Sequence, residues 1–474
     1  MARTGDPLRI YTLDDLPPEV VAVTFARTSR SPESFDEIAR DLTEESSSRF
    51  HEKWVVGYGH SSVAEHAVLS VAVENISILG AKVVEDNRLS SFTEKSTRYQ
   101  VMSPENYYTP SVFADGEAGE VYRRGVADLY TTYEALLPEA LRFAEERYGS
   151  AACRERGLAP SGKACDAVRG LLPAAAKTNL GWTVNARSLR HAIVKLGSHP
   201  LEEMRELATA LTKVAGERVP TLLRYTEPSP YLSGWEARMR PTAPEPPGAE
   251  VSADGQASAV RLVEHDPEGE RVVLAALLFR AGGSSYESVR REVDGWSDER
   301  VADALERAVE GVREHEAPVR ELETTDYTFE ITCDFGAYRD VQRHRMATQT
   351  RQPLSCLLGY EVPDDARDAG VDGRMTAALD RAGETWRALR DIDADAAQYA
   401  VPLAYRVRFL MRMDLREAFV FCRLRSRVQG HESYRRIAWA VRDGIERVHP
   451  ALGRLIPVDR ETVDATLLTT EADR

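Results

Sequence analysis

Residues 343–353 read RHRMATQTRQP, and this basic run decides how the rest of the chain is interpreted. Arg343, His344 and Arg345 stand side by side, and clustered cations repel one another unless an anion meets them. Arginine binds phosphate through two parallel hydrogen bonds, and histidine adds a donor that titrates near neutral pH. The run therefore predicts an anion-binding site, although a solvated basic turn is the alternative for an isolated motif.

A partly altered copy of this segment lies upstream, where DNRLSSFTEKSTRY begins at Asp86. Arg88 then corresponds to Arg345. Other segments recur in the same order: GYGHSSVAEH from residue 57 matches VREHEAPVRE from residue 312, and TVNARSLRHAIVKL from residue 183 matches RMDLREAFVFCRLR from residue 412. Ordered self-similarity of this kind predicts a duplicated domain.

The boundary between the two copies is predicted from composition. Residues 226–258 are rich in Pro, Gly, Ser and Ala, which is typical of a linker. We therefore expect a first domain at 1–225 and a second at 259–474. Each should open with a strand and then a helix, from Leu8 and from Val260. Alternating apolar residues at 67–77 and 327–335 predict strands, and helical periodicity appears at 201–218 and 432–448. The predicted class is α+β.

Charge and composition narrow the range of possible functions and locations. A net charge of −15 argues against nonspecific nucleic-acid or membrane binding, because both favour basic surfaces. The absence of a long apolar run or of an apolar signal-peptide core leads us to expect a cytoplasmic protein. The five cysteines include no CxxC pair, so we expect free thiols and no metal site.

The RHR run and the Ser-x-Arg-Tyr at residues 96–99 together resemble the signature of the flavin-dependent thymidylate synthases, and the likeness covers most of the chain. The resemblance implies two tandem copies of a small domain built of an antiparallel sheet and helices. In that family four domains assemble, and each active site lies between subunits. It implies FAD as cofactor, NADPH as its reductant, methylenetetrahydrofolate as one-carbon donor and dUMP as acceptor.

The resemblance also implies roles for single residues. It assigns FAD contacts to two groups, one in each half; these are His60, Ser62, Glu65, Asn185 and Arg187 in the first half and Arg343, His344 and Arg345 in the second. It assigns nucleotide contacts to Glu94, Ser96, Arg98, Arg169, Arg343 and Arg425. Arg425 would lie beside the uracil ring and, with Arg343, would carry the catalysis.

Each half departs from the family pattern in a different place. In the first half, Asp86-Asn87-Arg88 replaces RHR, and Leu196 stands where the second half has Arg425. In the second half, Pro353, Ser355 and Cys356 replace Ser96, Arg98 and Tyr99. We further match His60, Ser62 and Glu65 with His315, Ala317 and Arg320, Asn185 with Asp414, and Arg169 with a position near Gln398.

Because the losses are complementary, we expect one composite site with RHR and Arg425 from the second domain and the other groups from the first. Two fused domains would then form a homodimer that mimics the family tetramer. Alternatives remain open: decay of both copies, a flavin- or nucleotide-binding protein without methylation, an enzyme acting on another pyrimidine nucleotide, and a structural subunit.

Overall fold

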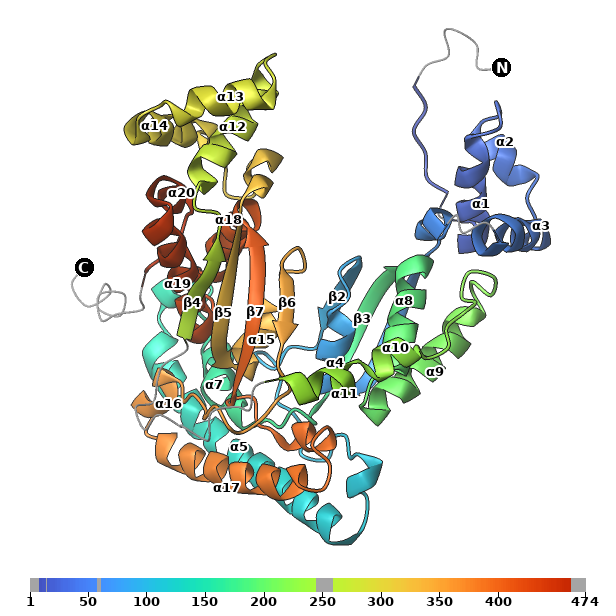
Figure 1. Cartoon of the computed structure of the whole chain (residues 1–474). Coiled ribbons are helices and arrows are strands. Elements are labelled where there is room, and N and C mark those ends of the chain that lie inside the picture. The colour runs from blue at the N-terminus through green and yellow to red at the C-terminus, as the bar shows by residue number, and fades with distance from the viewer. Residues whose placement is uncertain (1–7, 14, 58–60, 244–258, 462–474) are drawn as a thin grey trace. The chain divides into compact units, whose positions relative to one another are not determined.

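The computed structural model describes residues 8–13, 15–57, 61–243 and 259–461. They form two compact units (Figure 1). The first unit comprises Met1–Lys95, Tyr107–Ala114 and Lys177–Pro246, and the second comprises Ser96–Asn106, Asp115–Ala176 and Pro247–Arg474. Within the described residues, no helix is both long and apolar enough to cross a lipid bilayer.

The first unit contains an antiparallel sheet of three strands in the order β1-β3-β2, formed by β1 (Val68–Ser77), β2 (Ser90–Glu94) and β3 (Lys177–Asn185). Buried and exposed residues alternate along β3, so one face of the sheet enters the core. Helices α4 (Ile78–Glu85) and α8 (Ala186–Gly197) pack on this sheet, and α9 (Glu202–Gly216) packs on α8. The remaining helices of this unit are α1 (Pro18–Thr28), α2 (Phe35–Arg40), α3 (Glu44–His51), η1 (Glu52–Gly57), η2 (Ser61–Glu65), η3 (Ser111–Phe113), α10 (Pro230–Ser233), α11 (Trp235–Met239) and η5 (Arg240–Thr242).

The second unit contains an antiparallel sheet of four strands in the order β4-β5-β7-β6, formed by β4 (Ala259–His265), β5 (Asp326–Asp334), β6 (Thr348–Arg351) and β7 (Arg406–Asp414). Helices α15 (Phe335–Val341), α18 (Leu415–Arg425) and α19 (Glu432–Val448) pack around it. Its other helices are α5 (Gly116–Tyr148), α6 (Ala151–Glu155), α7 (Pro160–Val168), η4 (Arg169–Leu171), α12 (Gly269–Ala281), α13 (Tyr286–Asp294), α14 (Asp298–Val309), η6 (Arg320–Thr324), α16 (Asp364–Asp368), α17 (Asp372–Arg390), η7 (Ala396–Ala400) and α20 (Pro450–Leu455).

The two sheets share one plan, because the order β1-β3-β2 recurs as β5-β7-β6. The helix caps recur as well. Ser77 and Asp334 end β1 and β5, and each accepts a backbone hydrogen bond at the start of the next helix. Each cap also forms a hydroxyl–carboxylate hydrogen bond to another helix, but the two residue types change places. Ser77 donates to Glu203, whereas Asp334 accepts from Ser433. The predicted α+β class with two copies of one domain is confirmed.

One predicted strand is wrong. Residues 8–13 form no strand, and the side chains of Leu8 and Ile10 are 88% and 87% exposed. The corresponding β4 in the second unit pairs with β5, whereas residues 8–13 pair with no strand and so bury no apolar face. The strands predicted at 67–77 and 327–335 and the helices at 201–218 and 432–448 are confirmed to within a few residues as β1, β5, α9 and α19. The segment read as a linker contains α10, α11 and η5 in its described part.

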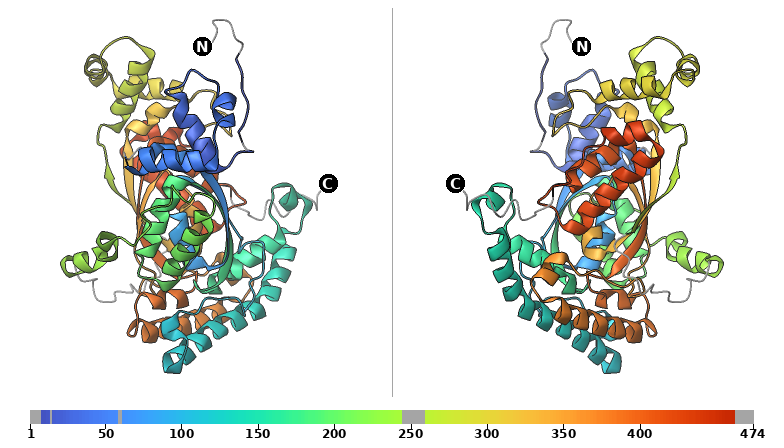
Figure 2. Two further views of the ribbon diagram at one scale, coloured as in Figure 1. Left: turned by 90° about the vertical axis from the view of Figure 1, so that its right-hand side faces the viewer. Right: turned by 90° about the vertical axis from the view of Figure 1, so that its left-hand side faces the viewer.

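Residues 115–176 belong to the first sequence half but to the second compact unit. Their long helix α5 packs beside α17, as both views of Figure 2 show. Backbone bonds in this region are reciprocal: the amide of Ala174 donates to Val401 at 2.8 Å, and the amide of Leu403 donates to Leu172 at 2.9 Å. Pro173 and Pro402 form the bridge between them. Residues related by the repeat thus exchange bonds about a local twofold axis, as in a symmetric dimer interface.

All five cysteines are free and buried, as expected from the sequence.

Candidate functional site

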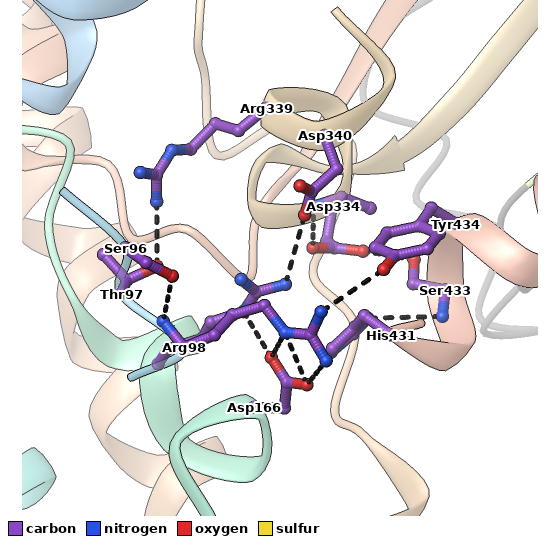
Figure 3. A network of polar contacts seen from close by, with 12 residues as sticks. Ser96, Thr97, Arg98, Asp166, Asp334, Arg339, Asp340, His431, Ser433 and Tyr434 are labelled. Atoms are coloured by element: carbon purple, nitrogen blue, oxygen red, sulfur yellow. Dashed lines mark hydrogen bonds and ion pairs between the residues drawn. The ribbon is translucent and has the colours of Figure 1, made fainter. Parts of the chain in front are cut away.

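Arg98 is anchored by several hydrogen bonds within the second unit. Its Nε donates to both oxygens of Asp166 at 2.9 and 3.0 Å, and its Nη2 donates to Asp166 Oδ2 at 2.7 Å (Figure 3). The same guanidinium reaches the hydroxyl of Tyr434 at 3.4 Å and the carbonyl of Gln429 at 2.9 Å. Asp166 lies on α7, from the first sequence half, and Tyr434 lies on α19, from the second. Arg98 therefore joins the two halves inside one compact unit.

Asp340, on α15, gathers the other arginines. Its carboxylate lies 3.9 Å from Arg169 Nη2, 3.9 Å from Arg425 Nη1 and 4.0 Å from Arg343 Nη1. Arg169 also lies 3.3 Å from Asp166. Four predicted site arginines, two from each half of the sequence, thus surround two aspartates. We call this group of six residues (Arg98, Arg169, Arg343, Arg425, Asp166 and Asp340) the arginine cluster.

The electrostatics of the arginine cluster favour anions. Burial acts to raise the pKa of Asp340, but the guanidinium groups of Arg169, Arg425 and Arg343 outweigh it and hold that pKa below its usual range. Burial likewise acts to raise the pKa of Asp166. Arg169, His431 and Arg98 outweigh this effect and lower the pKa to about 2. Both aspartates are therefore ionised at neutral pH. Four guanidinium groups thus lie around two ionised carboxylates.

The open side of the cluster lies at Arg343, whose side chain is 46% exposed. On the other side, Asp166 and Arg169 line a small cavity together with Asp334, Glu361 and His431. Its volume is about 20 Å³, enough for roughly one water molecule. Arg343 is the most exposed of the four arginines, so we expect an incoming anion to meet it first.

The two neighbours of Arg343 differ in exposure. Arg345 is partly buried in the turn that follows α15, and its amide donates to the carbonyl of Arg343 at 3.0 Å. His344 is buried, and both of its ring nitrogens are used within the protein. Nδ1 lies 2.9 Å from Glu417 Oε1, and Nε2 accepts from Arg425 Nε at 2.9 Å.

Ser96 contributes to a turn. Its hydroxyl accepts from the amide of Arg98 at 3.2 Å, and the adjacent Thr97 accepts from Arg339 at 3.1 Å (Figure 3). A serine hydroxyl that accepts a hydrogen bond from the backbone of its own turn stabilises the conformation of that turn. Ser96 therefore orients Arg98 toward Asp166.

The remaining nucleotide candidate, Glu94, lies in the first unit. Its side chain is buried and accepts a hydrogen bond from Lys82 Nζ at 2.9 Å, and Lys82 also contacts Glu85. Charged side chains that are fully buried are normally held in such pairs. This geometry makes Glu94 the counter-ion of a buried lysine.

The described flavin candidates of the first unit lie near the start of α8. Asn185 is the N-cap of α8 and accepts from the amide of Ser188 at 2.8 Å. Arg187 pairs with Glu65, and Ser62 is exposed on the same short helix, η2. His60 lies outside the described residues. Together these side chains leave an exposed polar surface at a helix N-terminus.

The structure corrects the match between the halves here. Glu323 on η6 pairs with Arg416 at 2.7 Å, just as Glu65 on η2 pairs with Arg187. The counterpart of Glu65 is therefore Glu323, and the predicted match to Arg320 is wrong. The acid–base pair survives in both halves, so it also ties a short helix to the start of α8 or α18.

Sequence reasoning missed Asp166, Asp340 and Tyr434. Asp340 precedes Arg343 by three residues, one helical turn away, which places both side chains on one face. Asp166 precedes Arg169 by the same spacing. These acid–arginine pairs are the signal that could have identified the two aspartates, whereas nothing in the local sequence marks Tyr434.

Comparison with known proteins supports the same family in both halves. The family model for thymidylate synthase complementing protein matches residues 12–221 and 261–451. A UPF0159 protein of Chlamydia muridarum is 30% identical and covers 98% of this chain and 95% of its own length. A UPF0159 protein of Chlamydia pneumoniae is 32% identical, with 85% and 78% covered.

Other relatives, which match less than half of this chain, are named flavin-dependent thymidylate synthases. The flavin-dependent thymidylate synthase of Clostridium tetani is 26% identical over 45% of this chain and 83% of its own. A solved structure of the Helicobacter pylori flavin-dependent thymidylate synthase with FAD and dUMP shares 21% identity, covers 42% of this chain and 99% of that one, and has a TM-score of 0.32. Because one family model matches both halves of the sequence, the chain belongs to the thymidylate synthase complementing protein family, that of the flavin-dependent thymidylate synthases.

Proposed function

We propose that this protein transfers the one-carbon unit of methylenetetrahydrofolate to C5 of dUMP, using FAD that NADPH has reduced. The observation that carries the proposal is the arginine cluster, in which residues predicted from opposite halves of the sequence surround Asp340. Guanidinium groups that gather in this way suit a nucleotide phosphate, which arginine binds through paired hydrogen bonds. Membership of the family supports the flavin.

The proposed roles follow from position. Arg343, at the exposed edge, would meet the phosphate first, and Arg98 would complete its binding. Arg425 is largely buried, and a guanidinium in that setting can stabilise negative charge that develops on the uracil ring. Arg169 keeps the two aspartates and the other guanidinium groups in place. These groups orient the nucleotide, which is the protein's main contribution when a cofactor carries the chemistry.

For the cofactor, we propose the residues that the family resemblance implies, which are Ser62, Glu65, Asn185 and Arg187 in the first unit and Arg343 and Arg345 in the second. Of the side chains in the first unit, Arg187 is the cation, and it could meet an anionic group of the cofactor such as a pyrophosphate. FAD, when bound, would supply the reducing equivalents. Glu94 stays a proposed nucleotide contact, although its buried side chain, paired with Lys82, would have to become accessible first.

Product analysis tests the proposal. Purified protein should convert dUMP to dTMP when supplied with methylenetetrahydrofolate, FAD and NADPH, and Arg343→Ala and Arg98→Ala should each abolish the conversion. Arg374→Ala is the matched control, because this arginine pairs with Glu139 on the exposed faces of α17 and α5. Normal turnover by both site variants would contradict the proposed site.

A second candidate is a protein that binds flavin and nucleotide without methylation. It is favoured by the departures Asp86-Asn87 and Pro353 from the family pattern. In that case dUMP and FAD would bind, but no dTMP would form under any reductant.

A further inference from the structure

The hydrogen bonds around His344 define its protonation state. Arg425 Nε carries a hydrogen and can only donate, so His344 Nε2, at 2.9 Å, must accept. The ring hydrogen must then lie on Nδ1, where it donates to Glu417 Oε1 at 2.9 Å. Glu417, His344 and Arg425 thus form a directional chain of bonds, which we call the histidine triad. Its imidazole is neutral.

The triad is held rigidly. His344 is buried against the ring of Phe421 on α18, with ring centroids 4.8 Å apart. Its backbone carbonyl accepts from the side chain of Gln349 at 3.2 Å. Glu417 lies in the first turn of α18 and Arg425 in the last, so the imidazole bonds to side chains from both ends of one helix. Both ring nitrogens are thus occupied by bonds within the protein.

We propose that His344 is a positioning residue, which fixes the guanidinium of Arg425 for contact with the nucleotide. In metal sites, an outer-shell group commonly orients a functional histidine through a hydrogen bond. Here the histidine is itself the supporting group, and it orients an arginine. The role assigned to Arg425 rests on the proposed function. The tautomer and the bond to Arg425 do not.

The triad depends on pH through three charged groups that face the ring: Glu417 and Arg425 on α18, and Asp340 on α15. Burial lowers the pKa of His344 below its usual value of 6.5, against the opposing effect of Glu417. Protonation would place an N–H on Nε2, opposite the N–H of Arg425, and would set two cations side by side. The contact is therefore present above pH 6.5 and is lost as pH falls through the lowered pKa.

Two substitutions separate positioning from packing. In His344→Gln the side-chain oxygen can still accept from Arg425, whereas in His344→Leu that buried donor has no partner. Calorimetric titration with dUMP at pH 7.5 should show affinity within about threefold of wild type for Gln and about tenfold or more weaker for Leu, the cost of one lost bond to a charged group. His449→Gln is the control, because this buried histidine bonds Tyr327 away from the cluster.

The pH profile adds a readout that packing alone does not move. Titration of the dUMP phosphate weakens binding by every variant, so the profile of His344→Gln serves as the baseline. Wild type should lose affinity more steeply than this baseline below pH 6.5. Glu417→Gln, which removes the carboxylate that favours the imidazolium, should move that extra loss to lower pH. A Leu variant that binds like wild type, or a wild-type profile that follows the Gln baseline, would overturn the proposal.

Nitrogen NMR of protein labelled with ¹⁵N-histidine decides the geometry independently of function. The signal missing from His344→Gln identifies the residue, and at pH 7.5 it should show hydrogen on Nδ1 only. Hydrogen on Nε2 would overturn the proposal. Absence of dUMP binding by wild type would instead refute the proposed function. The nitrogen chemical shifts alone would then test whether His344 accepts the bond that positions Arg425.

Discussion

At the scale of single residues, the arginine cluster illustrates how a cationic site is built in advance. Arg98 and Arg169 are mostly buried, and isolated charges in that setting are strongly disfavoured. Asp166 and Asp340 offset part of that cost before any ligand arrives. The same carboxylates must oppose an incoming phosphate, so the cluster balances stability against affinity.

This balance predicts the effect of Asp340→Asn. The variant keeps an oxygen acceptor but removes a negative charge about 4 Å from three guanidinium groups. Inorganic phosphate should bind at least several-fold tighter, and the affinity should depend more steeply on salt. Titration calorimetry at two salt concentrations measures both, with Asp368→Asn, an exposed partner of Arg147, as control. Unchanged or weaker phosphate binding would mean that Asp340 acts only as an anchor.

Asp166→Asn should act mainly on stability. It leaves Arg98 with one neutral partner in place of a bidentate carboxylate, and removing one member of a buried pair costs about 3 kcal/mol. Urea unfolding at pH 7 measures this loss. Because the pKa of Asp166 is lowered to about 2, its contribution is complete above its ordinary value of 3.8 and disappears as pH falls toward 2. A stability difference that persists unchanged at pH 2 would contradict this assignment.

At the scale of elements, the N-cap of α15 combines structure with a titration. Asp334 accepts from the amide of Ala337 at 2.7 Å and from the hydroxyl of Ser433. Burial, and then the charge of Glu361, raise the pKa of this carboxyl. The protonated form is therefore favoured in the folded protein. Its stabilising effect is complete below pH 3.8 and is lost as pH rises through the raised pKa.

Asp334→Asn should therefore stabilise the protein at pH 8, by on the order of 1 kcal/mol, because asparagine keeps the cap and avoids the buried charge. The gain should vanish at pH 4. Thermal unfolding at the two pH values tests this, and Asp414→Asn, the equivalent cap of α18, provides the comparison. A variant that is less stable at pH 8 would show that the ionised carboxylate is needed.

Much of the fold could be predicted from local patterns at this scale. β1, β5, α9 and α19 have strong periodicity, and the structure confirms all four. Residues 8–13 could not, because strand formation there depends on a neighbouring strand rather than on its own alternation. The match of Glu65 with Glu323 also could not be predicted, since a short 3-10 helix has no hydrophobic period by which the two halves can be aligned. The site arginines were found through the family signature, but their aspartates were not, because their importance arises only when distant segments meet.

At the scale of the whole molecule, the duplication has been used asymmetrically. The first half contributes Ser96–Asn106 and Asp115–Ala176 to the second unit, and with them Arg98 and Arg169. The reciprocal bonds between residues 170–175 and 399–404 reproduce, inside one chain, the contact that a symmetric dimer makes between two. We propose that two chains then form a homodimer equivalent to the family tetramer, with a mass by light scattering twice that of the chain.

Mixed dimers test whether each nucleotide site is completed within one chain. An Arg98→Ala chain and an Arg343→Ala chain, carrying different tags and purified through both, should bind no dUMP, because each chain holds one broken site. The reciprocal mixture, wild type with an Arg98→Ala/Arg343→Ala chain, should bind one dUMP per dimer. If sites were shared between chains, these results would be exchanged: one site in the first mixture and none in the second. Binding stoichiometry by calorimetry distinguishes the two cases without requiring turnover. The contacts of Arg98 and Arg343 around Asp166, Asp340 and Tyr434 lead us to expect the first result.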